Sequence, residues 1–211
     1  ALIMTFAGLR RGELVPLRWS DVDLERGIIN LKRFCYVEHS QFVEKEEGKT
    51  DSARRSIPLP PALVDYLIEY RRSGKVTSVF VCPKQDGSMH SPASFRRMWE
   101  RYLKLLNYKY GFEVPHDPKE TIGKKDLPMR IKPFSPHECR HSYATLLFWE
   151  DVPVQKSMQL LGHSDIEMTA NVYTDLERST LEFSDTFKEQ LQPTKRFVSL
   201  IFLFLDRKSV V

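Results

Sequence analysis

The segment 135–138 is a helix start that constrains where the most chemically distinctive residues of the chain can lie. It has Ser at the N-cap, Pro at the first helical position and Glu at the third, which together form a capping box. A helix that begins here carries His137, Arg140 and His141 in its first two turns, where residues three and four apart are neighbours. Because the free backbone N–H groups of a first turn favour an anion, the sequence predicts an anion site on this helix.

Two glycines and one turn signal organise the first sixty residues. Residues 1–18 are expected to form a helix that is interrupted around Gly8 and Gly12. Residues 28–59 are expected to form strands, with a turn at 48–52. The predicted fold class is therefore α+β, a mostly helical domain with a small three-stranded antiparallel sheet near its N-terminal end.

Helices are expected to dominate the rest of the chain. Apolar residues at helical spacing follow Pro61 and Pro92, and both stripes are expected to face the core. A helix opened by Pro153 is expected to end at Gly162, because glycine suits the left-handed conformation that follows many helices. Ser164 begins a second S-x-x-E pattern, which predicts one more helix.

Composition excludes several protein classes and leaves nucleic-acid binding open. The 32 Lys and Arg residues against 28 Asp and Glu give a net charge of +4, which permits a nucleic-acid partner without requiring one. The 3 cysteines include no C-x-x-C pair, so we expect no disulfide framework or Cys-rich zinc module, and we expect a cytoplasmic setting. A polar stretch at 107–134 contains Lys124 and Lys125 in a basic cluster, which is either a functional loop or a solvated surface.

The two ends of the chain predict boundaries for the domain. The chain begins inside an apolar run without an initiator Met, so we interpret residues 1–194 as an N-terminally truncated domain. Residues 197–205 are nearly all apolar but too few to cross a bilayer, which needs about 20 helical residues. We interpret residues 195–211 as a non-native tail, with docking on a neighbouring subunit as the alternative, and we expect no membrane partner.

The segment that begins at His137 also matches the zinc pattern H-E-x-x-H, in which two His bind the metal and the Glu is a general base. A metzincin would have Gly and His where this chain has Ala144 and Leu147. Arg140 would also place a permanent cation beside the metal. We therefore favour the anion site and expect no metal and no other cofactor.

Four further segments give the anion site its context. Arg10 stands three residues before Glu13 in a G-x-R-x-x-E-L pattern, and Lys49 lies in the predicted turn between strands. His163 ends an L-G-H sequence, and Tyr173 follows it by ten residues. The order and spacing of these segments resemble those of the catalytic domain of the tyrosine recombinases, also called the phage-integrase family. Arg11 and Lys45 are the nearby alternatives to Arg10 and Lys49.

The resemblance covers residues 1–190, and its motifs are similar to those of the integrases of bacterial phages and conjugative transposons. Ala7 stands where the family often has Thr or Ser, and Cys139 where it often has Leu. Neither difference removes a catalytic group. The resemblance implies a site-specific DNA recombinase or integrase, an enzyme that breaks and rejoins DNA strands.

In the reaction that the resemblance implies, Tyr173 attacks a backbone phosphorus, forms a 3′-phosphotyrosyl bond and releases a 5′-hydroxyl. Neither ATP nor a metal is needed, because the covalent intermediate conserves the energy of the broken phosphoester bond in a new phosphoester bond to the tyrosine. Arg10 and Arg140 would hold the phosphoryl oxygens and His163 would donate a further hydrogen bond. His137 would accept the proton of the tyrosine.

The remaining roles follow from the same resemblance. Lys49 would protonate the departing 5′-oxygen, and Glu13 and His141 would orient the arginines. The residues expected to contact DNA are Arg10, Lys49, Arg140, Lys124 and Lys125. The expected partner is double-stranded DNA at recombination sites, bound by a homotetramer, with a monomer in the absence of DNA and an accessory directionality factor as further expectations.

Three alternatives remain open at this point. A type IB topoisomerase uses a similar set of residues to relax DNA. A zinc peptidase would use His137 and His141. A DNA-binding fragment of a decayed mobile element would have no catalysis at all.

Overall fold

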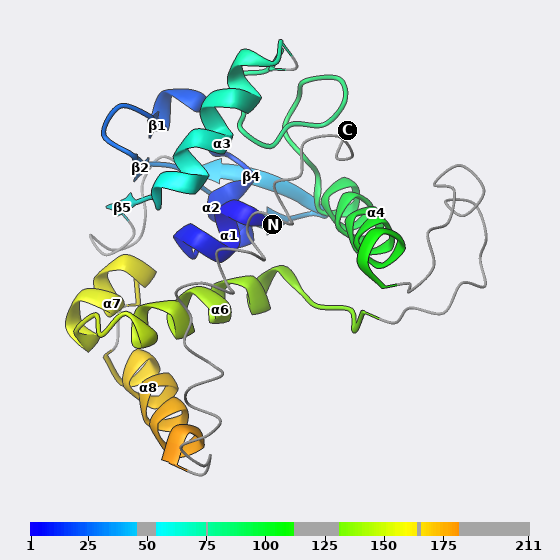
Figure 1. Cartoon of the computed structure of the whole chain (residues 1–211). Helices are drawn as coiled ribbons and strands as arrows, with labels where there is room; N and C mark the ends of the chain where they lie inside the picture. The colour runs from blue at the N-terminus through cyan, green and yellow to red at the C-terminus, as the bar shows by residue number, and fades with distance from the viewer. Residues whose placement is uncertain (46–53, 75, 112–130, 164–165, 182–211) are drawn as a thin grey trace.

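The computed structural model describes residues 1–45, 54–74, 76–111, 131–163 and 166–181 (Figure 1). Its helices are α1 (Leu2–Ala7), α2 (Arg11–Leu14), the 3-10 turn η1 (Trp19–Asp21), α3 (Pro61–Arg72), α4 (Pro92–Tyr110), α6 (Pro136–Trp149), α7 (Val154–Leu161) and α8 (Ile166–Leu181). Its strands are β1 (Val22–Asp23), β2 (Ile28–Leu31), β3 (Phe34–Glu38), β4 (Gln41–Lys45) and β5 (Arg55–Pro58). The predicted α+β fold class is confirmed.

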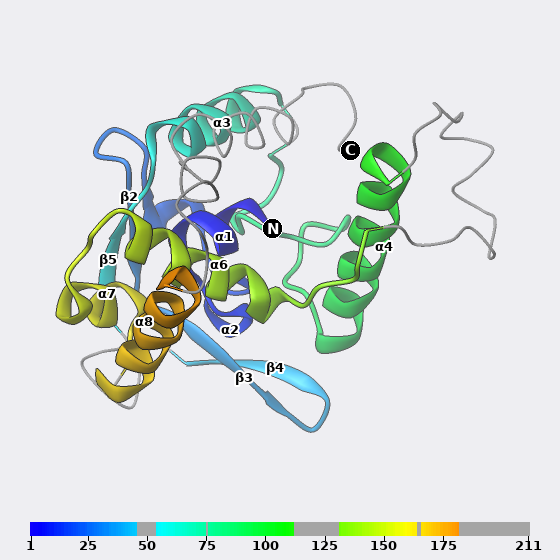
Figure 2. The same ribbon diagram turned by 60° about the horizontal axis from the view of Figure 1, so that its bottom comes forward.

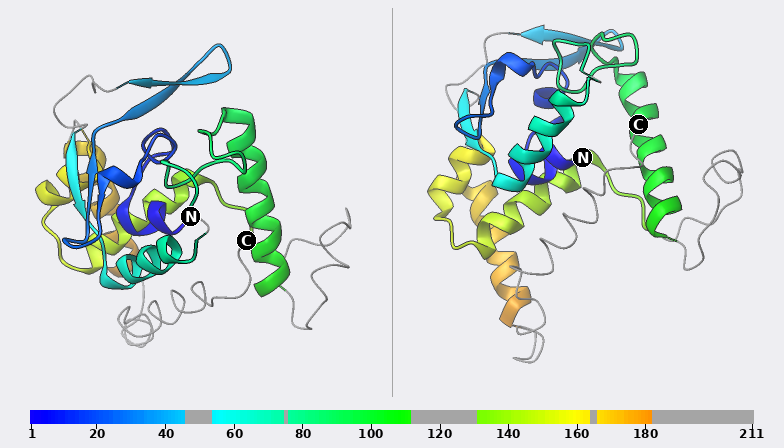
Figure 3. Two further views of the ribbon diagram at one scale, coloured as in Figure 1. Left: turned by 90° about the horizontal axis from the view of Figure 1, so that it is seen from above. Right: turned by 45° about the horizontal axis from the view of Figure 1, so that its top comes forward.

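The sheet near the N-terminus is antiparallel and three-stranded, in the order β1-β2-β5, as predicted. Ile29 and Ile57 are register partners across its central pair, and both side chains are fully buried. β3 and β4 pair separately as a ribbon that extends away from the helices (Figures 2 and 3). His39 and Ser40 close this ribbon with positive φ values of 45° and 62°, as a tight hairpin turn requires.

The break between α1 and α2 is made by Gly8, whose φ of 62° lies in the left-handed region. The Tyr143 ring of α6 packs where a Cβ on Gly8 would stand, so only glycine allows this close approach. α1 therefore packs directly on α6, and the carbonyl group of Gly8 faces α6. The predicted interruption of the first helix is confirmed, and it brings two distant segments together.

Two groups of buried residues hold the fold together. The larger joins α1, α2, the sheet, α3 and α4, and contains the predicted stripes at Leu63, Leu67, Phe95 and Trp99. The smaller joins α6 to α7 through buried residues that include Tyr143. Burial of each large apolar side chain stabilises the fold by about 1.5–3 kcal/mol. In Figure 1, α6, α7 and α8 lie on one side of α1 and α2, and the sheet and α3 lie on the other.

The start of α6 agrees with the sequence prediction, whereas the end of α4 does not. The capping box of α6 is confirmed, because the Ser135 backbone N–H donates to the Glu138 carboxylate at 2.6 Å and the Ser135 hydroxyl accepts from the Glu138 N–H at 3.3 Å. The prediction that a polar stretch without helical periodicity begins at 107 is wrong, because α4 continues to Tyr110. The buried Asn107 explains the difference, because its side chain accepts from the backbone N–H of Ile131 at 3.0 Å.

Several expectations lie outside the described residues. These are the turn at 48–52, the N-cap at Ser164, the lysines at 124 and 125, and the segment 195–211. Among the helices that are described, none is long and apolar enough to cross a membrane.

Candidate active site

A buried carboxylate, Glu13 on α2, organises the site. Its two oxygens accept from both terminal nitrogens of Arg55 at 3.0 Å each. They also accept from the side chain of Arg10 at 3.0 Å and from its backbone N–H at 2.7 Å. A third guanidinium, that of Arg140, lies 4.0 Å away. Burial alone would raise the pKa of Glu13, but the hydrogen bonds and charge of Arg55, followed by those of Arg10, lower it, so the group is a carboxylate at neutral pH.

The guanidinium groups of the same three arginines bind backbone carbonyls at the C-terminus of α7. The Arg55 Nε donates to the Leu160 carbonyl at 2.7 Å, Arg140 donates to the Leu161 carbonyl, and Arg10 donates to the Gly162 carbonyl at 3.0 Å. These successive carbonyls are the unpaired acceptors at the negative end of the helix dipole. Gly162, with a φ of 64°, ends the helix as predicted. α7 therefore gathers guanidinium groups from α2, β5 and α6.

Arg140 is the most deeply enclosed of the three arginines, with a side chain 4% exposed. Its second donor reaches the Gly8 carbonyl at 2.6 Å, across the close contact between α1 and α6. Burial and then the charge of Arg10 lower the pKa of Arg140, yet a guanidinium stays protonated at neutral pH. Three such cations against the single carboxylate of Glu13 leave positive charge for an anion to neutralise. An anion can reach these cations from solvent at Arg10, because the Arg10 side chain is 40% exposed.

His163 stands beside this cluster, directly after Gly162. Burial and then the positive charges of Arg140 and Arg10 lower its pKa to about 4, so the ring is neutral at neutral pH. Its Nδ1 lies 2.8 Å from the hydroxyl of Thr169 on α8.

His137 and His141 project from the first turns of α6 and are exposed. Their rings pack edge to face with centroids 4.6 Å apart. Burial, the neighbouring His141 and then the arginines at 140 and 10 lower the pKa of His137, which leaves it neutral at neutral pH. His137 therefore lies within the electrostatic influence of Arg140 and Arg10, and its expected role as the base stays a prediction. His141 lies against His137, and its expected support of the arginines stays a prediction.

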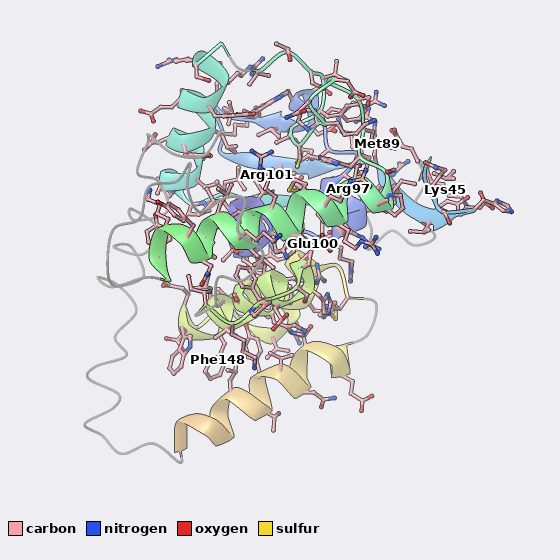
Figure 4. All side chains as sticks on the ribbon, turned by 90° about the vertical axis from the view of Figure 1, so that its right-hand side faces the viewer. Lys45, Met89, Arg97, Glu100, Arg101 and Phe148 are labelled. Carbon is pink, nitrogen blue, oxygen red and sulfur yellow. The ribbon has the colours of Figure 1, made fainter. Side chains whose placement is uncertain are left out.

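The structure does not bring the hydroxyl of Tyr173 to the arginines. The hydroxyl lies 2.7 Å from that of Ser157 and donates to the Val152 carbonyl at 3.1 Å. Phe148, which projects from α6 toward α8 in Figure 4, packs edge to face on the Tyr173 ring at 5.2 Å. The residue is 8% exposed, and burial raises the pKa of its phenol while the Ser157 hydrogen bond opposes the rise. Tyr173 is therefore docked toward the N-terminal side of α7, whereas the arginines end at its C-terminus.

The structure distinguishes Arg10 from its neighbour in the sequence. Arg11 is exposed and its guanidinium lies over the Phe42 ring at 5.4 Å, away from Glu13. Lys45 lies over the Tyr36 ring at 4.9 Å. Lys49, Lys124 and Lys125 are not among the described residues, so their roles stay predictions.

Comparison with known proteins identifies the family of this chain. The sequence profile of the phage integrase family matches residues 1–179. This chain belongs to the phage integrase family. The family resemblance expected from the sequence is confirmed.

Similar proteins of this family are recombinases and integrases by name. Tyrosine recombinase XerA of Thermococcus kodakarensis is 30% identical over 82% of this chain and 48% of its own length. The XerC-like tyrosine recombinase of Caldanaerobacter subterraneus is 28% identical over 79% of this chain and 42% of its own. The chain thus spans about half the length of the curated relatives it matches.

Solved structures of the family share the fold. The Tn1549 transposon integrase, in complex with circular intermediate DNA, superposes with a TM-score of 0.58 and 25% identity, over 86% of this chain and 57% of that one. A crystal structure of XerA recombinase superposes with a TM-score of 0.53 and 21% identity, over 90% of this chain and 54% of that one. Neither comparison supports the zinc-peptidase alternative. Within the described part of the chain, no group of three His, Cys, Asp or Glu side chains could hold a metal ion.

Sequence reasoning missed three residues of this candidate site. Arg55 lies in a segment expected only to form a strand, and it shares a strand face with the buried Ile57. A charged residue on an inward face is a signal of a buried ion pair. Ser157 and Thr169 are small polar residues in helices, and only tertiary packing shows their partners.

Proposed function

We propose that the chain is the catalytic part of a site-specific DNA recombinase or integrase, which cleaves and rejoins DNA through a 3′-phosphotyrosyl intermediate without metal or ATP. The observation that carries this proposal is the convergence of Arg10, Arg140 and His163 at the C-terminus of α7. Three sequence-distant segments supply these groups, and their excess positive charge fits a DNA phosphate. The DNA complex of the similar Tn1549 integrase supports the same partner.

The arginines hold the phosphate in this proposal. Arg10 is half open to solvent and Arg140 is enclosed, so a phosphoryl oxygen would meet one accessible and one fixed cation. Guanidinium groups suit this task because they stay charged and can bind two oxygens. Glu13 keeps them in place while the negative charge grows on the phosphoryl oxygens.

The nucleophile must be released before it can attack. Tyr173 sits at Ser157 and Val152, on the order of 10 Å along α7 from the last carbonyls, as the helical rise implies. α8 would carry its hydroxyl from this docked position to the phosphate. His137, neutral at neutral pH, accepts the phenol proton, and Lys49 donates a proton to the departing 5′-oxygen.

The covalent step is balanced without a further reactant. The phenol oxygen of Tyr173 forms a bond to phosphorus, and the bond from phosphorus to the 5′-oxygen breaks. Attack by the 5′-hydroxyl of a partner strand reverses the exchange and frees the tyrosine. Two strand exchanges need several subunits, so we infer a homotetramer on DNA, with an accessory directionality factor.

The test is covalent trapping by the full chain on a library of nicked duplexes with randomised sequence. The nick lets the 5′-end diffuse away, so a phosphotyrosyl adduct accumulates and can be recovered after denaturation and sequenced. We expect an adduct with the unmodified chain and none with Tyr173→Phe, while both bind DNA equally. Absence of adduct from both variants supports the non-catalytic alternative and contradicts the proposal. Relaxation of supercoiled DNA without strand exchange supports the topoisomerase alternative.

A further inference from the structure

We propose that Thr169 is a positioning residue that sets the tautomer of His163, so that the Nε2 of this histidine carries the proton offered to the phosphate. The inference rests on the proposed function, because it concerns how one member of that site is oriented. It adds a residue that lies outside the set expected from the sequence.

The contact is local and enclosed. The Thr169 Oγ1 lies 2.8 Å from the His163 Nδ1, and Thr169 is fully buried. Gly162, in the left-handed conformation, turns the chain out of α7 so that His163 meets α8. With Nδ1 occupied by the threonine, Nε2 is the ring nitrogen left for a substrate.

The tautomer matters because a neutral imidazole has one N–H. Burial and the cations around His163 keep the ring neutral. If Thr169 donates its hydroxyl proton to Nδ1, the ring proton must be on Nε2, which can then donate to a phosphoryl oxygen. If Nδ1 donates to Thr169 instead, Nε2 presents a lone pair, which repels that oxygen.

The cations and the phosphate favour opposite tautomers, so an internal device is needed to hold the productive one. Without DNA, the positive charges of Arg10 and Arg140, which lower the pKa of His163, favour the tautomer whose lone pair faces them. A hydroxyl that donates to Nδ1 opposes this preference before the substrate arrives, and thereby preorganises the donor.

Two variants separate the hydroxyl from the shape of the side chain. Thr169→Val keeps the branched volume and removes the hydroxyl, whereas Thr169→Ser keeps the hydroxyl. Thr174→Val on the same helix is the matched control, because Thr174 is exposed. Thermal unfolding of each variant shows whether the fold is retained.

The readout is the 15N spectrum of the imidazole nitrogens in the full chain labelled at histidine, with His163 assigned by its loss in His163→Gln. We expect the Nε2–H tautomer in the unmodified chain, in Thr169→Ser and in Thr174→Val. We expect Thr169→Val to populate the Nδ1–H tautomer and to form adduct about 10-fold more slowly on the trapped DNA, in line with other losses of a ring-orienting partner. An Nδ1–H tautomer in the unmodified chain, or an unchanged tautomer in Thr169→Val, overturns the inference.

The spectrum is informative even if the proposed function fails. A chain that forms no adduct can still show the Nε2–H tautomer and its loss in Thr169→Val, so the two failures are distinguishable. A slower adduct in Thr169→Val with an unchanged tautomer would assign Thr169 a structural role only, which also overturns the inference.

Discussion

The hydroxyl of Tyr173 lies 2.7 Å from the hydroxyl of Ser157, in a contact enclosed by α6, α7 and α8. Ser157 is fully buried in α7. The tyrosine hydroxyl therefore contacts α7 at Ser157, whereas Arg10 binds the Gly162 carbonyl at the C-terminus of the same helix. The proposed nucleophile and the proposed phosphate site are thus separated by a single short helix. In the proposed reaction, release of this contact is a separate step with a free energy of its own.

Ser157→Ala should release the tyrosine more easily. A hydrogen bond of this kind contributes about 0.5–1.5 kcal/mol, so its loss should raise the rate of adduct formation about 3- to 10-fold on the trapped DNA. Single-turnover kinetics measure the rate, and Ser142→Ala on the exposed side of α6 is the control. A rate that is unchanged or lower would show that docking at Ser157 does not limit attack.

Arg55→Met should destabilise the fold strongly, because it leaves the buried carboxylate of Glu13 without its bidentate partner. Both side chains are less than a tenth exposed, at 7% and 3%. Breaking such a pair costs about 3–5 kcal/mol, to be measured as a lower urea midpoint. Arg97→Met is the matched control, since Arg97 is exposed on α4 (Figure 4), and we expect a change of less than about 0.5 kcal/mol.

A double variant tests the origin of that loss. Glu13→Gln removes the buried charge itself, so Arg55→Met should cost less in its presence than alone. Equal costs in the two backgrounds would mean that the pair is not the source of the destabilisation.

Local signals in the sequence predicted much of the fold. The capping box at Ser135 and the glycines at 8 and 162 act through backbone conformation within a few residues, and each forms as expected. The prediction for the end of α4 is wrong because the Asn107 side chain accepts a hydrogen bond from Ile131, 24 residues away in the sequence. Tertiary hydrogen bonds of this kind leave no periodic pattern.

The site was predicted unevenly for the same reason. Motif spacing selected Arg10, Arg140 and His163, and the fold brings all three to one helix end. Spacing gives no information on the partners of Arg55 or Thr169, whose contacts depend on strand and helix packing. It also gives the position of Tyr173 in the chain but not the docked position of its hydroxyl.

The low pKa of His163 predicts how stability depends on pH. The folded pKa of about 4 lies below the ordinary value of 6.5, so between these values the unfolded chain binds more protons than the folded one. The free energy of unfolding is therefore highest above pH 6.5, as far as His163 is concerned, and it decreases as the pH falls toward 4. With solvent screening allowed for, the loss is about 1 kcal/mol. Urea unfolding at pH 7 and pH 4.5 should show a smaller drop for His163→Gln than for the unmodified chain, and equal drops would contradict the assignment.

Gly8→Ala should disrupt the site through the backbone. Gly8 has a φ of 62°, and a Cβ there would overlap the Tyr143 ring, so α1 must move away from α6. The Gly8 carbonyl, which accepts from Arg140 at 2.6 Å, would move with it. We therefore expect a loss of more than about 2 kcal/mol in the free energy of unfolding, together with slower adduct formation.

Gly74→Ala supplies the matched control for this substitution. Gly74 has a similar φ of 74°, but nothing lies within 4 Å of the added Cβ, so its cost should be only the backbone term of about 1 kcal/mol. The difference between the two variants isolates the contact with the Tyr143 ring. In Tyr143→Ala, where that ring is absent, Gly8→Ala should cost nearly the same as Gly74→Ala. If Gly8→Ala remains as costly in that background, the overlap with the ring is not what requires glycine at this position.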